Sequence, residues 1–161
     1  MQLILSHFNP KKGPRILISF PRNVSDEVKN PILVNLTRYN ESNYILDEID
    51  EKPAAHVLFY LASSMNLGSD EKVLLSVILE RKINPNSFIQ ILYDLAVKIN
   101  AQSGLEKGLY YFESEPNLDS AIERNYILLR DLMASFLDQI RDQLKTLKNT
   151  PINLNNSDGW A

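Results

Sequence analysis

The two histidines, His7 and His56, are the side chains best suited to proton transfer or metal binding near neutral pH. Both lie in apolar runs that predict strands, and neither has an Asp, Glu or Cys at the spacing of a metal-binding motif. The serines that could act as nucleophiles lie outside any G-x-S-x-G pattern; they are Ser6, Ser63, Ser64 and Ser76. We therefore expect both histidines to have packing or edge roles, and we expect no catalytic residue.

The densest acidic cluster, Asp47, Glu48, Asp50 and Glu51, lacks the spacing and the glycine of a calcium-binding loop, so it predicts a solvated turn. No G-x-x-x-x-G-K-[ST] segment is present, so the chain is not expected to be a GTPase itself. The sequence contains no cysteine, which excludes disulfides and thiolate chemistry and suits a reducing compartment. These patterns predict a protein that is not an enzyme and has no metal site and no cofactor.

A cluster of turn residues in the segment HFNPKKGPRILISFP separates two predicted strands. The runs Leu3–Phe8 and Arg15–Phe20 are rich in β-branched and aromatic residues and predict a β-hairpin. Gly13 can supply a positive φ in the connection, while Pro10 and Pro14 fix φ and stop the strand pairing at its ends. We expect a rigid hairpin tip.

Three cations, Lys11, Lys12 and Arg15, lie at the same tip. The chain has a net charge of −3 and no basic block, so nucleic acid is not an expected partner. Solvation is the expected role of the three side chains. The alternative is that the fixed backbone presents them to an acidic loop of a partner or to a lipid headgroup.

The next elements are predicted from the spacing of apolar residues and from the position of turn residues. Pro31 opens a predicted helix that ends at Tyr39, and residues 25–28 are expected to form a separate turn, because Pro31 argues against one continuous helix. Asn43–Ile49 alternates in character and predicts a strand that Pro53 ends.

Two apolar runs, Ala55–Met65 and Val73–Ile83, predict strands that are covered on both faces and joined by a hairpin loop at residues 66–70. Asn84 and Pro85 open a second helix over residues 84–101. Its buried stripe consists of Phe88, Ile91, Leu92, Leu95 and Ile99. The short aromatic segment Gly108–Glu113 predicts a loop or a brief extended stretch.

The longest predicted element is an amphipathic helix over Leu118–Lys148. Such a helix is roughly 45 Å long, whereas a five-stranded sheet is only about 20 Å wide. We expect its second half to overhang and to form an interface through Phe136, Ile140, Leu144 and Leu147. A second copy, a different subunit, or the tail with Ile152, Leu154 and Trp160 would cover it. The alternative is a curved helix that its own domain covers.

These elements follow the order β-β-α-β-β-β-α-α. A five-stranded antiparallel sheet with helices on both faces is a three-layer α-β-α sandwich of the α+β class. The length suits a single domain over residues 1–148, followed by a flexible tail at 149–161. No run approaches the roughly 20 apolar residues of a membrane-spanning helix, and the first apolar run is too short for a signal peptide. We therefore expect a cytoplasmic protein.

This order resembles the longin domain, a profilin-like relative of the roadblock fold. The hairpin tip is similar to the first hairpin of longin domains in nitrogen-permease-regulator-like proteins, in which F-x-P-x-x-G-P-x-(I/V) recurs. The matching positions are Phe8, Pro10, Gly13, Pro14 and Ile16. In size the chain also resembles free-standing longin-like domains of archaea related to eukaryotes. Its long last helix departs from the family.

The resemblance implies a platform rather than a catalyst, because longin and roadblock domains dimerise and serve Ras-like GTPases and vesicle-trafficking complexes. We expect a non-catalytic scaffold or regulator that pairs with a second copy or with another longin- or roadblock-type domain. The expected partner contacts are Phe8, Pro10, Lys11, Lys12, Gly13, Pro14 and Arg15. Peripheral membrane contact remains open. The alternative is a small-ligand-binding or enzymatic domain of the profilin-like superfold, with a cavity between the sheet and the helix at residues 84–101.

Overall fold

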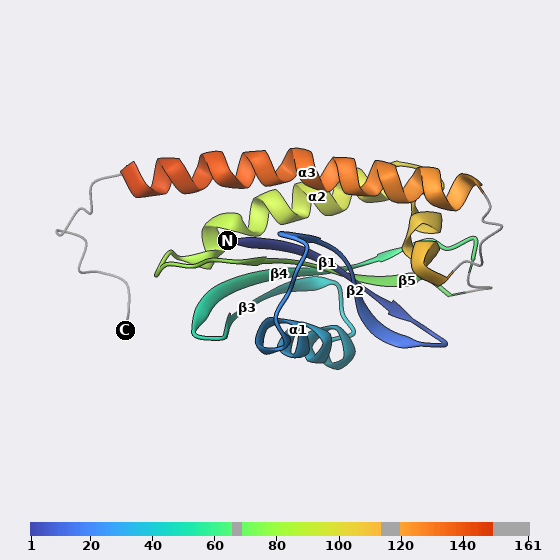
Figure 1. The fold of residues 1–161 in the computed structure, drawn as a ribbon, viewed down its shortest axis with the longest axis horizontal. Helices are drawn as coiled ribbons and strands as arrows, with labels where there is room; N and C mark the ends of the chain where they lie inside the picture. Colours follow the sequence, from blue (N-terminus) through green and yellow to red (C-terminus); the bar gives the residue numbers. More distant parts are fainter. Residues whose placement is uncertain (66–68, 114–119, 150–161) are drawn as a thin grey trace.

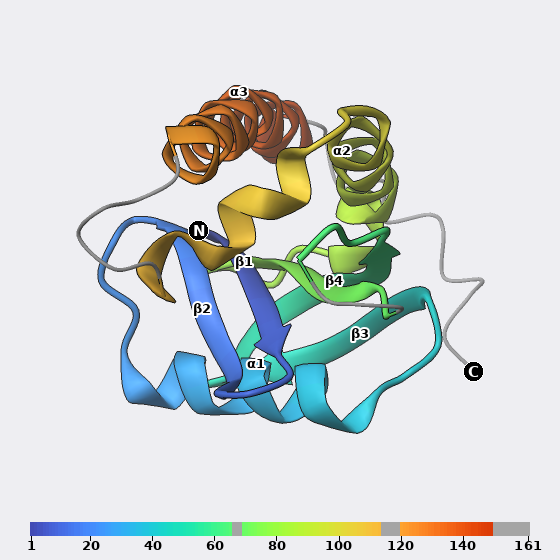
Figure 2. The same cartoon turned by 90° about the vertical axis from the view of Figure 1, so that its right-hand side faces the viewer.

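The structure, a computed structural model, describes residues 1–65, 69–113 and 120–149. Its centre is a five-stranded antiparallel sheet in the order β2-β1-β5-β4-β3, which confirms the predicted α+β class. The strands are β1 (Gln2–Asn9), β2 (Gly13–Phe20), β3 (Asn43–Ile49), β4 (Lys52–Leu61) and β5 (Glu71–Ile78). The helix α1 (Asp26–Arg38) covers one face, and α2 (Ile89–Ala101) and α3 (Ser120–Asn149) cover the other (Figures 1 and 2). Two 3-10 helices, η1 (Pro85–Phe88) and η2 (Leu105–Glu113), precede α2 and α3.

Alternation along the central strands divides the apolar side chains between two cores. In β5, Leu74 and Ile78 face α1, whereas Leu75 and Val77 face α2 and α3. All four side chains are at most 1% exposed. The prediction that this strand is covered on both faces is therefore confirmed.

Helix α1 runs through Pro31, so the expectation of a separate turn at residues 25–28 is wrong. Val28, Ile32 and Leu36 recur every four residues and are at most 2% exposed against the sheet. Pro31 removes one helical hydrogen bond, to the carbonyl of the exposed Glu27, at a cost of about 3 kcal/mol. Burial of three large side chains, each worth about 1.5–3 kcal/mol, outweighs that loss.

The strands after α1 also differ from the prediction in their bounds. Asp50 and Glu51 form a two-residue hairpin turn with φ of 50° and 61°, the left-handed values that such a turn requires. Pro53 therefore lies near the start of β4, where proline is tolerated. The strand predicted over 55–65 is β4, and the strand predicted over 73–83 is β5, which ends at Ile78. Residues 66–68 of the predicted loop lie outside the described residues.

The segment predicted as a loop or extended stretch, Gly108–Glu113, is instead part of the helix η2. Leu105 and Leu109, four residues apart, are both 1% exposed in the core shared with α3. A Cβ on Gly108 would lie 2.6 Å from the backbone N of Tyr126, so the absence of a side chain lets η2 touch α3. Burial of these leucines explains why the short segment coils.

The second half of α3 does not overhang, so the predicted interface is wrong. Figure 2 shows α2 beside α3 above the sheet. The predicted overhang compared the length of α3 with the width of the sheet alone, and it left out the cover that α2 supplies. Phe136, Ile140 and Leu144 are 2%, 0% and 9% exposed within the core, and Leu147 is partly buried against it. The Lys98 Nζ of α2 lies 5.5 Å from the ring centre of Phe136. The alternative of a helix covered by its own domain holds.

Two further expectations concern the ends of α3 and the membrane. Residues 118–119 of the predicted helix and 150–161 of the predicted tail, including Ile152, Leu154 and Trp160, lie outside the described residues. Among the helices of the described ranges, none has the length and apolar character needed to cross a membrane.

Candidate functional site

The tip of the β1–β2 hairpin is fixed by its own backbone and by one side chain. Asn9 Oδ1 accepts hydrogen bonds from the backbone N–H groups of Lys11 (2.8 Å) and Lys12 (3.0 Å). Gly13, opposite Asn9 in the strand register, has a φ of 83°, which confirms the positive φ expected there. This Asx-type turn explains why the tip holds one shape.

The predicted tip residues take different environments. Lys11 and Lys12 are exposed, and Pro10 and Lys11 line a cavity of about 280 Å³ with side chains of η2 and α3. Phe8 packs on the α1 side of the sheet and lies opposite Pro14 in the β1–β2 register. Its ring centre is 5.8 Å from Lys72 Nζ. The tip motif therefore has a structural part inside the sheet and an accessible part at the turn.

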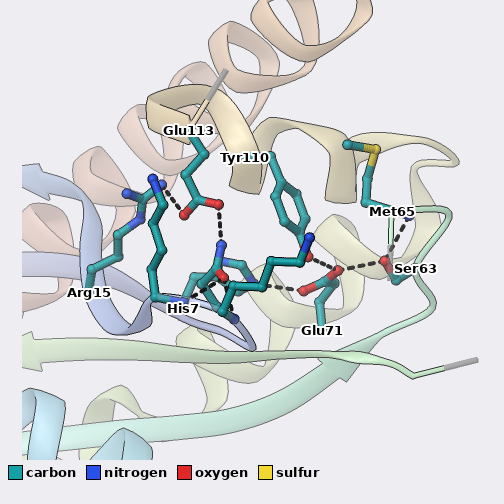
Figure 3. Close-up of polar contacts among 10 residues, drawn as sticks. His7, Arg15, Ser63, Met65, Glu71, Tyr110 and Glu113 are labelled. Atoms are coloured by element: carbon teal, nitrogen blue, oxygen red, sulfur yellow. Dashed lines mark hydrogen bonds and ion pairs between the residues drawn. The ribbon is translucent and has the colours of Figure 1, made fainter. Parts of the chain in front are cut away.

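Arg15 is not a free cation, because Glu113 of η2 pairs with it. Its Nη2 lies 2.6 Å from Glu113 Oε1, and its guanidinium lies 5.9 Å from the ring centre of Phe112. Asn9 Nδ2 donates to the other oxygen of Glu113. Figure 3 shows Glu113 reaching down from η2 to the hairpin, so this carboxylate ties η2 to both strands of the tip.

Beneath the tip, Glu71 accepts three hydrogen bonds (Figure 3). His7 Nε2 donates to Oε2 at 2.7 Å, and the hydroxyls of Ser63 and Tyr110 donate to Oε1, each at 2.5 Å. Burial alone would raise the pKa of Glu71, but the bonds from His7, Ser63 and Tyr110 outweigh it and hold the pKa below its ordinary value. Burial, and then the bond to Glu71, raise the pKa of Tyr110. Glu71 is thus a carboxylate held in its charged form.

This cluster has catalytic residue types, but its histidine and its carboxylate are buried. The side chains of His7 and Glu71 are both 0% exposed, and a substrate would need to reach one of them. Tyr110 packs edge-on against the His7 ring, with ring centres 5.5 Å apart. The arrangement joins β1, β5 and η2, and a structural role fits this burial.

A second polar chain crosses the sheet under α1. His56 lies between Asp47 Oδ1, 2.8 Å from its Nε2, and Ser76 Oγ, 2.7 Å from its Nδ1. Asn35 of α1 donates to the other oxygen of Asp47 at 2.8 Å. Burial would raise the pKa of Asp47, but the bonds and charge of His56 and the bond from Asn35 lower it. The residue types match a Ser-His-Asp triad, yet Ser76 and His56 are 0% exposed, so this serine cannot attack a substrate.

Neither histidine–carboxylate pair was predicted from the sequence. His7 and Glu71 come from strands far apart in sequence, and their approach depends on the β1–β5 register, in which His7 lies opposite Val73. One signal was present for the other pair. The alternation of β3 puts Asp47 on the inner face between Ile45 and Ile49, where a carboxylate requires a polar partner.

A groove of about 790 Å³ runs along the outer edge of β2. Its floor and walls are β2 residues 15–20, the linker to α1, and side chains of η2 and α3. The wall residues from outside β2 are Arg22, Tyr111, Phe112, Tyr126 and Arg130. The groove is the largest concave surface that combines a sheet edge, aromatic rings and cations in the described residues.

No group of three or more His, Asp or Glu side chains in residues 1–65, 69–113 and 120–149 is arranged to hold a metal ion. Comparison with known proteins adds no identification: no protein-family model matches the chain, and no curated protein matches it. Around the hairpin tip, the accessible features include the open β2 edge with its groove, the smaller cavity beside it, and a hollow between Pro14 and α1.

Proposed function

We propose that this protein is a non-catalytic interaction module of the longin type, acting in the cytoplasm as a scaffold or regulator of a Ras-like small GTPase or a membrane-trafficking complex. The observation that carries the proposal is the open edge of β2 beside the groove, because an unpaired strand edge offers backbone groups to a partner. The burial of the His7–Glu71 pair, and of His56 with Ser76, supports a role without catalysis. The element order supports the longin resemblance.

A pairing with itself or with another longin- or roadblock-type domain belongs to the same proposal. Since α3 buries its own apolar stripe, such a pair would use a sheet edge or the outer surface of a helix. Light scattering over a concentration series up to about 100 μM would detect self-pairing of ordinary affinity.

The partner class is tested by affinity capture. The tagged protein is incubated with cytosol of its own source in the presence of GDP or of a non-hydrolysable GTP analogue, and retained proteins are identified by mass spectrometry. We expect a Ras-like GTPase or subunits of a trafficking complex, enriched over a bait of matched size and charge. Retention of neither class in either nucleotide state contradicts the proposal.

A second candidate, small-ligand binding, is favoured by the cavity of about 280 Å³ at the tip. Lys11, Glu113 and Tyr110 line it, so both charge signs and an aromatic ring are present. The cavity lies between the hairpin, η2 and α3, not between the sheet and α2. Thermal-shift screening with cytosolic metabolites would favour this candidate if a compound raised the melting temperature and Lys11→Ala removed the effect.

A further inference from the structure

We propose that the groove beside β2 binds an extended, acidic segment of a partner protein, which adds to the sheet as a further strand. This inference rests on the proposed function and deepens it, because it names the surface and the chemistry of the partner. Three observations carry it: the unpaired strand edge, an ordered aromatic wall, and an excess of arginine.

The edge of β2 is open. The strand pairs only with β1 in the sheet order, and no other backbone hydrogen bond to residues 13–20 forms within the described part of the chain. A bulge at Leu5/Ser6 of the β1–β2 register brings Leu17 and Ile18 into the same core. The bulge divides the edge into short regular stretches, which suits a short segment and opposes indiscriminate sheet growth.

An aromatic cluster forms the wall above this edge. Tyr111 and Tyr126 stack with ring centres 4.1 Å apart and an interplanar angle of 8°. Phe112 packs edge-on against both rings, at 5.1 Å and 5.6 Å, and remains 55% exposed. Alternate side chains of an added strand would point toward these rings, which are already held in place and need little ordering on binding.

The groove has one sign of charge. Arg15, Arg22 and Arg130 line it and no Asp or Glu does, although the whole chain has a net charge of −3. The Arg15–Glu113 pair is 2.6 Å long, and Arg130 Nε lies 3.8 Å from the exposed Asp131. Two such grooves facing one another in a symmetric β2–β2 dimer would oppose their arginines, which disfavours that dimer. Acidic side chains on the added strand would pair with Arg22 and with Arg130, whose contact with Asp131 is long and exposed, whereas Arg15 keeps Glu113.

A second copy could present an acidic strand from the opposite edge of the sheet. The edge strand β3 exposes Glu48 together with Tyr44 and Leu46. Head-to-tail pairing of β3 on β2 would generate open chains of molecules rather than a closed assembly. A separate partner is therefore the occupant proposed here, and pairing between copies is an outcome that the test must distinguish.

The test uses an acetylated, amidated nonapeptide in which Glu and Val alternate, titrated into the 15N-labelled full chain of 18.4 kDa at pH 7. We expect amide shifts concentrated in residues 13–20 and 111–112, and cross-strand NOEs from the peptide backbone to β2. A peptide with Lys in place of Glu, and one with N-methylated Val, should each bind at least about tenfold more weakly, because they remove the charge match and the backbone pairing.

Matched variants locate the site. Arg22→Glu with Arg130→Glu should weaken binding of the acidic peptide at least about tenfold. Arg141→Glu, a charge reversal at the exposed far part of α3, should leave it unchanged. Preserved dispersion of the amide peaks will show whether each variant is folded. If a variant does not fold, the comparison of the three peptides on the unchanged protein still tests the proposal.

Several outcomes would overturn the inference: no binding at millimolar peptide, equal binding of the Lys peptide, or shifts centred away from β2. Concentration-dependent self-association that Glu48→Lys abolishes would instead make a second copy the occupant. Retention of a GTPase in the capture experiment, undiminished by Arg22→Glu with Arg130→Glu, would leave the proposed function standing and remove this site from it.

Discussion

Replacement of Glu71 by Gln should destabilise the protein although the two side chains have nearly the same shape. The carboxylate accepts from His7, Ser63 and Tyr110, whereas an amide offers one accepting oxygen and places an NH2 group against the remaining donors. His7 is 0% exposed, so its Nε2–H cannot turn to water if it loses Glu71. Ser63 and Tyr110 are partly exposed and can regain some hydration.

The magnitude follows from these bonds. One buried donor left without a partner costs about 1–3 kcal/mol, and each lost charge-assisted bond adds about 1 kcal/mol after rehydration. We therefore expect Glu71→Gln to lower the free energy of unfolding by about 2–4 kcal/mol at pH 7. In urea, with an m-value of about 2 kcal/mol/M for a domain of this size, the midpoint falls by roughly 1–2 M.

The difference in the free energy of unfolding between the Glu71→Gln variant and the unchanged protein should depend on pH in a defined direction. The folded pKa of Glu71 is lowered, so its contribution is complete above the unfolded pKa, about 4.3, and is lost as the pH falls through the folded value. The stability gap should therefore be constant above about pH 5 and should narrow below about pH 4. Urea unfolding followed by far-UV circular dichroism at a series of pH values measures it.

A matched control separates this network from a general charge effect. Glu80 is 69% exposed in its ion pair with the N-terminus, so Glu80→Gln should cost less than about 1 kcal/mol. Equal midpoints for Glu71→Gln and the unchanged protein at pH 7 would refute the reasoning. A gap that widened as the pH fell from 5 would do the same, because it would reverse the sign of the linkage.

Four further variants test the fold around the site by thermal denaturation. Gly13→Val should lower the free energy of unfolding by about 1–3 kcal/mol. The cost comes from backbone strain alone, since φ is 83° and a Cβ at this position would meet no other atom within 4 Å. Lys11→Ala with Lys12→Ala should leave the melting temperature unchanged. Gly108→Ala should destabilise more than Gly13→Val and weaken near-UV dichroism of the tyrosines, because its Cβ meets backbone atoms of α3 at 2.6–2.9 Å; a silent change would contradict the close packing of η2. Ile140→Asp with Leu144→Asp should unfold the whole domain, and a folded double variant would show that these side chains are not in the core.

The parts of the fold that the sequence predicts are those set by local physics. Asn43–Ile49 has the observed bounds of β3, because alternation and flanking turns define it from within. Asn84 accepts from the N–H of Asn86 at 3.0 Å, as its position before Pro85 indicates, although the first turn is the 3-10 helix η1. Gly13 takes the positive φ that the hairpin connection indicated.

The parts that the sequence does not predict depend on distant packing. Local rules start a helix at Pro31, but the observed helix begins at Asp26, because its first turn buries Val28 against the sheet. Part of the cover over α3 comes from α2 (Figure 2), so a comparison of helix length with sheet width could not have found it. The candidate site depends on distant packing in the same way. The groove forms only where β2, η2 and α3 come together, and no sequence motif predicts that these three elements are neighbours.

The buried network and the accessible groove are mechanically linked through η2. Tyr110 ties this helix to Glu71 inside the sheet, Glu113 ties it to Arg15 on β2, and Gly108 lets it rest on the backbone of α3. Phe112 and Tyr111, which form the groove wall, lie in the same helix between these attachments. The histidine–carboxylate pair therefore has a consequence at the surface although no ligand can touch it: it fixes the position of the rings beside the open edge. A protein that binds through a preformed groove gains affinity when the groove side chains are already fixed, because they lose less conformational entropy on binding.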